Sequence, residues 1–434
     1  FKQKTAYEIP KRDWSSDVCS SDLASIVIGY GITVLLVSLA PCLPCGRYGV
    51  EQFVSMRSVL GERGARVLMV VMSALLAAAW SAVLAIMCGH ALANVANQVL
   101  GTEISSGAGI VSVLAVLALS ASWAIVARGP RSIELVNRFV APGLVVVTLV
   151  MLALVFTRTS WSDLVATPAL DPWGDSHLDF MLAVELNIAG GFAWWPNVGN
   201  LARLTRTTRS AFWPNAIGLF LASVIAAIVG VFAALALGSE DPTLWMVPLG
   251  GALLGVLALA FVGMANVTSV VAQSYAALVA IKGGGGSAVR RMSWSLLAAI
   301  ILAPAAVLVF FPEAVYDNYA RFVSWGAIVV APLCAVQAVD FFVLRRQVLD
   351  VRALHLPHAE SRYGFLRGWN PVAVLAVVLG ALTYALLLNP VTYEPAGWFR
   401  HLTASLPAFA VAAVVHWVGT RLVLTRRADW GGYR

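Results

Sequence analysis

The sequence is poor in charged residues: Asp, Glu, Lys and Arg make up only 12% of its 434 residues. A soluble domain carries about 25% charged residues, so this chain lacks the polar side chains needed to cover itself against water. Hydrophobic residues account for 60% of the chain, and the mean hydropathy is +0.82. Composition therefore predicts an integral membrane protein, and the net charge of +7 belongs to its loops rather than to a nucleic-acid surface.

Sequence motifs of catalytic sites are missing as well. The chain contains no H-E-x-x-H, G-x-S-x-G or P-loop pattern, and its six histidines form no cluster of metal ligands. Cys42 and Cys45 form one C-x-x-C pair without a second pair or a histidine nearby, so we interpret them as small apolar packing residues. These absences argue against an enzyme and against a bound cofactor.

The first 23 residues lack the basic start, apolar middle and small-residue cleavage site of a signal peptide. Residues 2–9 and 13–23 instead resemble the translation, in one reading frame, of the constant parts of a short-read sequencing adapter. We therefore interpret residues 1–23 as an artefact, the alternative being a genuine polar cytoplasmic tail. Residues 24–425 are predicted to form a single transmembrane domain, and 426–434 a cytoplasmic tail.

Apolar runs long enough to cross about 30 Å of hydrocarbon recur up to the end of the chain. We expect eleven spans, of which the seventh is long enough to tilt or to project from the bilayer. The sequence "KGGGGS" (282–287) predicts a flexible loop after that span. The spans are predicted near residues 24–42, 66–89, 108–127, 139–156, 180–199, 212–237, 246–281, 293–311, 322–344, 370–388 and 403–424.

The loops between these spans alternate between basic and acidic. By the positive-inside rule the basic loops and the C-terminus are cytoplasmic, in a plasma or inner membrane. The first visible span then begins outside, so we expect one further helix before it and number the visible spans 2 to 12. The basic loops contain Arg47, Arg57, Arg63 and Arg66; Arg128, Arg131 and Arg138; Arg203, Arg206 and Arg209; Lys282, Arg290 and Arg291; Arg345, Arg346, Arg352, Arg362 and Arg367; and Arg421, Arg426, Arg427 and Arg434.

Span 6 contains residues that weaken a helix in mid-membrane. Gly190, Gly191 and Pro196 lie in "ELNIAGGFAWWPNVGNLARLTR". A broken helix exposes backbone groups that can bind a substrate or an ion where protein or water covers them. We therefore predict a broken helix here, with the two glycines beside the substrate.

Two tryptophans and two amides follow this break. Trp194 and Trp195 offer stacking surfaces, and Asn197 and Asn200 offer hydrogen-bond donors and acceptors. This combination suits a flat heterocycle. The alternative is a kinked helix whose tryptophans pack against neighbouring helices. Glu185 earlier in the span is a candidate proton carrier or substrate partner, or a residue of the outer vestibule.

Span 8 carries oxygen ligands at a spacing that suits a hard cation. The Ala265 carbonyl and the hydroxyls of Thr268 and Ser269 could supply three ligands to Na⁺. The hydroxyls could instead bond back to the preceding turn or permit close helix packing. In span 3, Trp80 lies on a face of small residues. It could stack on a substrate, or it could simply fill the space that the small residues leave.

Three stretches together resemble the nucleobase:cation symporter-1 family, the carriers of cytosine, purines, uracil, allantoin and hydantoins. "WGAIVVAPLCAVQAVDFFVLRR" (325–346) resembles the family's span 10. "GRYGVEQFVSMRSVLGERGAR" (46–66) resembles its loop between spans 2 and 3, and "WPNVGNLARLTR" (195–206) resembles the inner half of its span 6. The resemblance covers residues 24–425.

The resemblance implies an all-α membrane fold of the leucine-transporter type, with a five-plus-five inverted repeat and two extra C-terminal helices. It implies cation symport of a nucleobase-like heterocycle by alternating access, in a protein expected to be a monomer. Trp80 would stack on the substrate, Asn266 would bond its edge, and Ala265, Thr268 and Ser269 would bind Na⁺, with H⁺ as the other coupling ion.

The chain departs from the family pattern at three positions. Asn200 replaces an aspartate, Leu84 replaces a glutamine, and Gly191 replaces a stacking aromatic. Without that aromatic, Trp194 or Trp195 would have to form the second stacking wall. These departures leave the identity of the substrate open. A same-fold carrier of amino acids or osmolytes and a non-transporting sensor or fragment are the alternatives. Without the expected first helix, the chain is predicted not to transport.

Overall fold

The computed structural model describes residues 18–101, 108–168, 175–239, 241–426 and 431–433, and these residues form helices joined by turns, without a named strand among them. Most of the segment interpreted as adapter sequence lies outside the described residues. The helices on the predicted spans are α1 (Val18–Val37) with η1 (Ser38–Cys42) and α2 (Leu43–Tyr48), η2 (Met72–Leu76) with α5 (Ala77–Leu100), α6 (Ala108–Ala127), α7 (Pro130–Arg158), α9 (Ser176–Phe192) with α10 (Trp195–Ala202), α11 (Thr208–Leu237), α12 (Pro242–Gly284), α14 (Trp294–Leu308), α16 (Tyr319–Ala338) with η3 (Val339–Leu344), α18 (Pro371–Leu387), and α20 (Ser405–Gly419) with η4 (Thr420–Leu424).

Every predicted apolar span therefore falls on helix. Among the described residues, eight helices are long and apolar enough to cross a membrane, α14 and α18 are shorter apolar helices, and the remaining span is divided between α9 and α10. The long seventh span is interrupted inside α12 by Gly251, which has φ 71°. Shorter helices occupy the loops: α3 (Gln52–Ser55), α4 (Arg57–Val71), α8 (Trp161–Ala166), α13 (Ser287–Arg291), α15 (Pro312–Asp317), α17 (Val351–His355) and α19 (Phe399–Leu402).

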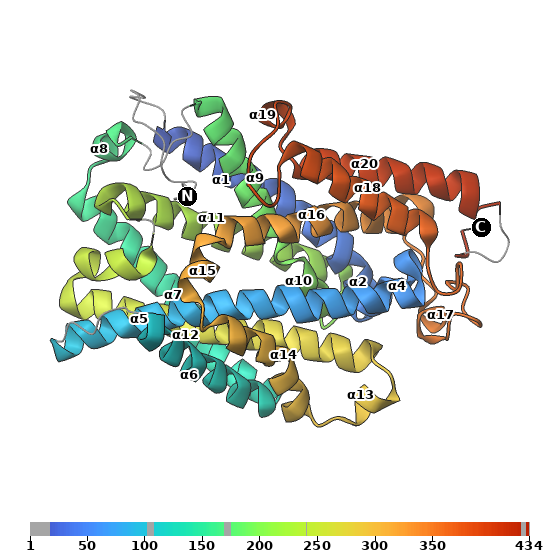
Figure 1. Cartoon of the computed structure of the whole chain (residues 1–434), viewed down its shortest axis with the longest axis horizontal. Helices are drawn as coiled ribbons and strands as arrows, with labels where there is room; N and C mark the ends of the chain where they lie inside the picture. The colour runs from blue at the N-terminus through green and yellow to red at the C-terminus, as the bar shows by residue number, and fades with distance from the viewer. Residues whose placement is uncertain (1–17, 102–107, 169–174, 240, 427–430, 434) are drawn as a thin grey trace.

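The helices pack as two groups that run mainly along the long axis of the molecule (Figure 1). In the first group α5 packs on α6, α12 and α14, and α12 also packs on α7. In the second group α1 packs on α9 and α11, and α16 packs on α9, α18 and α20. Small residues allow these contacts, because a Cβ on Gly191 of α9 would lie 2.7 Å from the Thr33 Cβ of α1.

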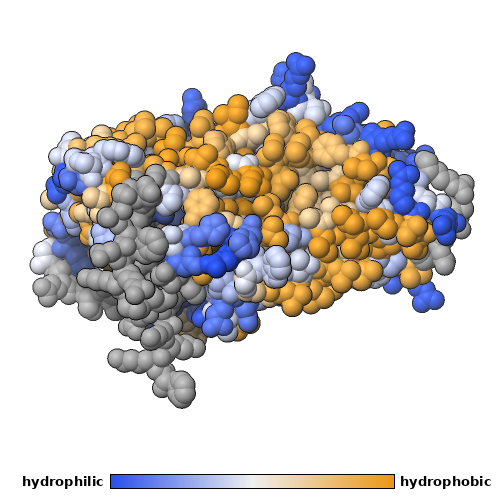
Figure 2. Space-filling view, turned by 90° about the horizontal axis from the view of Figure 1, so that it is seen from above, coloured by the Kyte–Doolittle hydropathy of each residue, from blue (hydrophilic) through white to orange (hydrophobic). Residues whose placement is uncertain are grey.

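Charge is segregated along the long axis. The helices α13 and α17 and the C-terminus lie at one end, whereas α8 lies at the other (Figure 1). Arg290 and Arg291 belong to α13 and Arg352 to α17, while α8 carries Asp163. Between the ends, apolar side chains cover much of the surface (Figure 2), including Leu253, which is 73% exposed on α12. This outer surface is suited to face lipid.

The prediction of a free glycine loop after span 8 is wrong. The helix α12 continues through Gly284, and α13 begins at Ser287. The Lys282 ammonium donates hydrogen bonds to the Arg290 and Met292 carbonyls, so the loop is tied back onto the end of its own helix. Cys42 and Cys45 are buried and free, which agrees with their interpretation as packing residues.

Candidate functional site

The predicted interruption of span 6 is present. The helix α9 ends at Phe192 and α10 begins at Trp195. Pro196 lies in the first turn of α10, where its missing N–H costs nothing, since the first N–H groups of a helix have no partner inside the helix. The interruption falls on Ala193 and Trp194, just after the glycine pair. Both residues keep right-handed helical dihedral angles and form a tighter turn, so the helix is kinked here rather than opened into extended backbone.

A cavity of about 200 Å³ lies beside this break, between α10 and α12. The Trp194 side chain on its wall is 43% exposed, and the apolar wall includes Leu201 and Val279. Four residues predicted for the site line this cavity, although they come from spans 6 and 8: Trp194, Asn197, Thr268 and Ser269. The polar and aromatic lining residues are Trp194, Asn197, Asn200, Arg203, Thr268, Ser269, Gln273 and Tyr275.

Two donors on the α10 side of this cavity make no hydrogen bond of good geometry in the described structure, although the buried Glu51 carboxylate interacts with both side chains. The Nδ2 amide of Asn200 and the Nε of Arg203 are buried and make no hydrogen bond within the described structure. A buried donor without a partner costs about 1–3 kcal/mol. Asn200 and Arg203 are therefore suited to bind an acceptor atom of a ligand. The sequence pattern offered the Asn200 amide for this purpose, whereas it placed Arg203 in a basic loop.

On α12, the oxygens predicted to bind a cation are close together. The Thr268 hydroxyl donates to the Ala265 carbonyl at 2.9 Å, which is the local back-bonding considered as the alternative. The lone pairs of the Thr268 hydroxyl stay available, and Ser269 lies on the cavity wall. The neighbouring Asn266 is buried with its Nδ2 unpaired. The donor set of hard, neutral oxygens fits an alkali cation.

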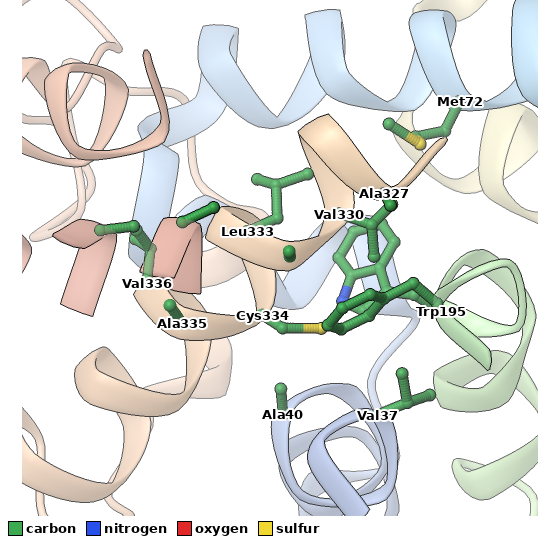
Figure 3. Packing of buried hydrophobic residues seen from close by; sticks show 14 of the residues in the cluster. Val37, Ala40, Met72, Trp195, Ala327, Val330, Leu333, Cys334, Ala335 and Val336 are labelled. Carbon is green, nitrogen blue, oxygen red and sulfur yellow. The ribbon is translucent and has the colours of Figure 1, made fainter. Parts of the chain in front are cut away.

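Trp195 does not lie on the cavity. Its side chain is fully buried, its indole N–H donates to the Gln337 amide oxygen at 3.1 Å, and its ring packs edge-on against Phe53. Figure 3 shows the indole beside Cys334 and Val330 in the core. A substrate contact by Trp195 is therefore corrected: the indole faces α16, and of the two predicted tryptophans Trp194 faces the cavity.

Gly190 and Gly191 also lie away from the cavity lining. A Cβ on Gly190 would lie 3.3 Å from the Tyr30 hydroxyl, and one on Gly191 would clash with Thr33. Both glycines therefore let α1 approach α9 closely, and the predicted contact of these residues with substrate has no counterpart in the cavity.

Trp80 lies apart from the cavity as well. Its half-buried ring on α5 packs edge-on against Phe322 at 5.1 Å and Tyr319 at 5.8 Å, both on α16. The Trp80 ring thus contacts aromatic rings of α16. The sequence had indicated only the small residues beside it on its own helix. A flat ligand that reached Trp80 would meet an aromatic cluster.

Glu185 joins two helices. Its carboxylate accepts hydrogen bonds from the Ala404 and Ser405 backbone N–H groups at 2.9 and 3.0 Å, and from the Ser405 hydroxyl at 2.6 Å. These groups begin α20, where a carboxylate caps unpaired N–H groups and interacts favourably with the helix dipole. Glu185 is 1% exposed, which rules out the outer-vestibule interpretation, and its contacts fasten α9 to α20.

Sequence reasoning missed one amide, Gln52 on α3. Its Nε2 donates to the Trp195 carbonyl, and its Oε1 accepts from the Gly199 N–H at 2.8 Å. The Gln52 backbone N–H donates to the Asn200 side chain at 3.2 Å. One side chain thus satisfies backbone groups of α10 and fixes this half-helix, a role that only the folded arrangement reveals.

A family model described as a permease for cytosine/purines, uracil, thiamine and allantoin matches residues 20–415. The chain belongs to this family. It is therefore a nucleobase-type membrane transporter rather than an enzyme, as the resemblance of its span 10 and loop patterns indicated.

Solved structures show the same fold. The inward-facing conformation of Mhp1 superposes with a TM-score of 0.74 at 16% sequence identity, covering 96% of this chain and 86% of that chain. Mhp1 in a closed conformation with bromovinylhydantoin bound, described as a nucleobase-cation-symport-1 family transporter, gives 0.71 at 18% identity, covering 96% and 88%. These likenesses confirm the all-α transporter fold. The search of curated proteins returned no match.

Proposed function

We propose that this permease imports a nucleobase-like heterocycle together with a cation, by alternating access around the cavity between α10 and α12. The observation that carries the proposal is the meeting, at the break of span 6, of a stacking surface, amide groups and hydroxyl oxygens. Broken helices of this kind form the substrate and ion sites of secondary transporters.

The half-exposed Trp194 ring would supply one stacking face for the heterocycle, and Asn197 would bond its edge. The unpaired Nδ2 of Asn200 would donate to a ring carbonyl or ring nitrogen. Trp80 and Asn266 are proposed to complete the site when the two helix groups move relative to one another. A second stacking face from Trp80 would bring the ligand next to Tyr319 and Phe322.

The coupling ion is proposed to be Na⁺, bound by the Ala265 carbonyl and the hydroxyls of Thr268 and Ser269, with H⁺ as the other candidate. The proximity of the Ala265 and Thr268 oxygens supports a cation site. We further propose a plasma- or inner-membrane monomer with a cytoplasmic C-terminus, since the basic loops share one end of the molecule.

We also propose that residues 1–23 derive from adapter sequence and that residues 24–425 form the transporter domain. This rests on the likeness of residues 2–9 and 13–23 to translated adapter, together with the loop charges. Long-read sequencing of the genomic DNA upstream of the Ala24 codon tests it. We expect a polar tail and one further apolar span, whereas a locus that encodes "FKQKTAYEIP" would refute the proposal.

The transport proposal is tested in two steps. A panel of nucleobases, hydantoins and amino acids is screened for an increase in the melting temperature of the purified chain. A heterocycle is expected to stabilise the chain, to lose this effect in Trp194→Ala, and to keep it in Trp213→Ala, which removes a 56% exposed tryptophan from α11. Stabilisation by amino acids alone would contradict the proposal.

The second step measures flux. The chain is extended by the residues that the genomic DNA encodes and reconstituted in proteoliposomes. Heterocycle-stimulated Na⁺ flux is expected to be lost in Ser269→Ala, while H⁺ flux that survives this change would favour proton coupling. Absence of substrate-stimulated flux of either ion would contradict symport.

A further inference from the structure

A second cavity lies at the basic end of the molecule, apart from the cavity between α10 and α12. Its volume is about 410 Å³, within the 300–1,000 Å³ typical of ligand sites. It forms where η3 and η4 end and where the C-terminal residues 432–433 return to the helices. It therefore lies where two membrane spans end.

The lining of this cavity is strongly basic. It contains Arg345, Arg346, Arg362 and Arg421 but only one carboxylate, Asp350. Asp350 lies 3.8 Å from the Arg362 guanidinium, and in the described part of the chain Arg346 and Arg421 form no ion pair. Two exposed cations therefore line this cavity without an ion-pair partner among the described residues.

A rigid floor lies beneath these cations. The buried Arg345 pairs with Asp340 at 2.7 Å and donates to the Gly431 and Ser58 carbonyls at 2.9 and 2.7 Å. Its guanidinium lies 4.7 Å from the Tyr363 ring centroid and 4.2 Å from that of Tyr433. The Arg345 charge is thus satisfied, and the floor holds the C-terminal residues in place without serving a ligand itself.

Exposed aliphatic side chains lie on the cavity and on the two helices that end at it. Val348 on the lining is 65% exposed. Val343 on η3 and Leu422 and Val423 on η4 precede the lining residues in sequence and are 47%, 54% and 42% exposed. Unpaired arginines next to exposed aliphatic side chains at the end of two spans match a molecule with an anionic head and a hydrocarbon tail. A soluble phosphate compound would use the arginines but not these aliphatic side chains.

We propose that the cavity binds the phosphate group of an anionic phospholipid, with the acyl chains along η3 and η4. Arg346 and Arg421 would bind the phosphate oxygens, as guanidinium groups do through paired N–H donors. Basic pockets between membrane helices at the cytoplasmic side are suited to such headgroups. The proposal does not depend on which substrate the permease carries.

The test compares lipids on the purified full chain. Mixed micelles with phosphatidylglycerol, with phosphatidylcholine, or with phosphatidylcholine plus inorganic phosphate are scored by melting temperature and by lipids retained in native mass spectrometry. Phosphatidylglycerol is expected to raise the melting temperature and to remain bound. The double variant Arg346→Gln/Arg421→Gln should lose both effects, while its melting temperature in phosphatidylcholine should stay unchanged because the Arg345 floor is intact.

The matched control is Arg209→Gln/Arg290→Gln, which removes the same charge from exposed positions outside the cavity. This control should keep the phosphatidylglycerol effect. Equal stabilisation by inorganic phosphate, lost only in the cavity variant, would support the phosphate site but assign it to a soluble ligand. No effect of either anion, or an equal loss in both double variants, would overturn the proposal.

Discussion

Trp194 and Trp195 are adjacent in sequence yet have opposite environments. Trp194 is 43% exposed on a cavity, whereas Trp195 is fully buried and hydrogen-bonded to Gln337. Successive side chains of a helix point about 100° apart, so one position separates the core from the ligand side. The sequence pair "WW" therefore places one indole in the packed core and the next one on the cavity that we propose binds the substrate.

The same contrast extends over the whole of α10. Its packed face is satisfied by fixed partners, since Gln52 bonds both the Trp195 carbonyl and the Gly199 N–H. On its cavity face, the Asn200 Nδ2 and the Arg203 Nε make no hydrogen bond of good geometry in the described structure and have only the Glu51 carboxylate nearby as an interaction partner. A half-helix that is fixed on one side and unsatisfied on the other is suited to hold a ligand without rearranging itself.

The largest loss of stability is expected for a change on the packed face of α10. Trp195→Ala removes a fully buried indole and should cost about 3–5 kcal/mol of stability, measured as a large fall in melting temperature in detergent. Trp195→Phe should recover most of the packing and lose the bond to Gln337. A melting temperature of Trp195→Ala equal to that of the unchanged chain would show that this side of α10 is not the anchored one.

A smaller loss of stability is expected at Gln52. Gln52→Ala removes both of these hydrogen bonds. Because the Trp195 carbonyl and the Gly199 N–H are four residues apart in α10 and can then bond to one another, we expect a loss of about 1–3 kcal/mol in total. The melting temperature should fall, and ligand binding should weaken because α10 is less fixed. Gln98→Ala on α5, an exposed amide outside both cavities, is the control; an equal effect of the two changes would contradict the role of Gln52.

Trp194→Ala should affect binding but not stability. Loss of an aromatic stack costs about 0.5–1.5 kcal/mol, which corresponds to a roughly two- to twelvefold increase in the Kd of the heterocycle. Isothermal titration with the stabilising heterocycle measures it. A destabilisation similar to that of Trp195→Ala, with unchanged Kd, would reverse the assignment of the two tryptophans.

The smallest effect concerns Glu62 at the basic end. Burial alone would raise the pKa of Glu62, but hydrogen bonds from the His358 backbone and ring, with Arg66 and Arg57 nearby, lower it overall below 4.5. A carboxylate with a lowered pKa stabilises the fold above its ordinary pKa and loses this contribution as the pH falls through the folded-state value.

The melting temperature should therefore fall on acidification below about pH 4.5, and Glu62→Gln should reduce this fall. Glu360→Gln in the loop that follows α17 is the control and should leave the acid dependence unchanged. Identical acid profiles of Glu62→Gln and the unchanged chain would contradict the role of Glu62.

The spans and the break in span 6 could be predicted because each depends on local composition. Long apolar runs must be helical in lipid, and Gly190, Gly191 and Pro196 weaken a helix wherever it packs. The hydrogen bond from the Thr268 hydroxyl to the Ala265 carbonyl could also be predicted, because the two residues lie within one helical turn. The alternative, a cation bound by the same two oxygens, depends on the same short spacing.

The remaining assignments depend on contacts between distant parts of the chain. The choice between Trp194 and Trp195 needs the position of α16, and the role of Glu185 needs the N-terminus of α20. Asn200 and Arg203 follow Asn197 at helical spacing on α10, so this signal was present in the sequence. The cavity at the end of η3 and η4 also involves residues 432–433, whose return to the helices no local pattern indicates.

The most direct test of the account is the accessibility of the α10 cavity face. Leu201→Cys is introduced into a Cys19→Ser background, in which the four remaining cysteines are buried. Leu201 is 56% exposed on the cavity wall and has no proposed bond to the substrate. The alkylation rate in membranes is measured with and without each heterocycle, and Thr208→Cys, exposed outside the cavity, is the control. We predict that the transported heterocycle slows alkylation at position 201 and not at 208, while equal rates with and without every member of the panel would contradict the proposed site.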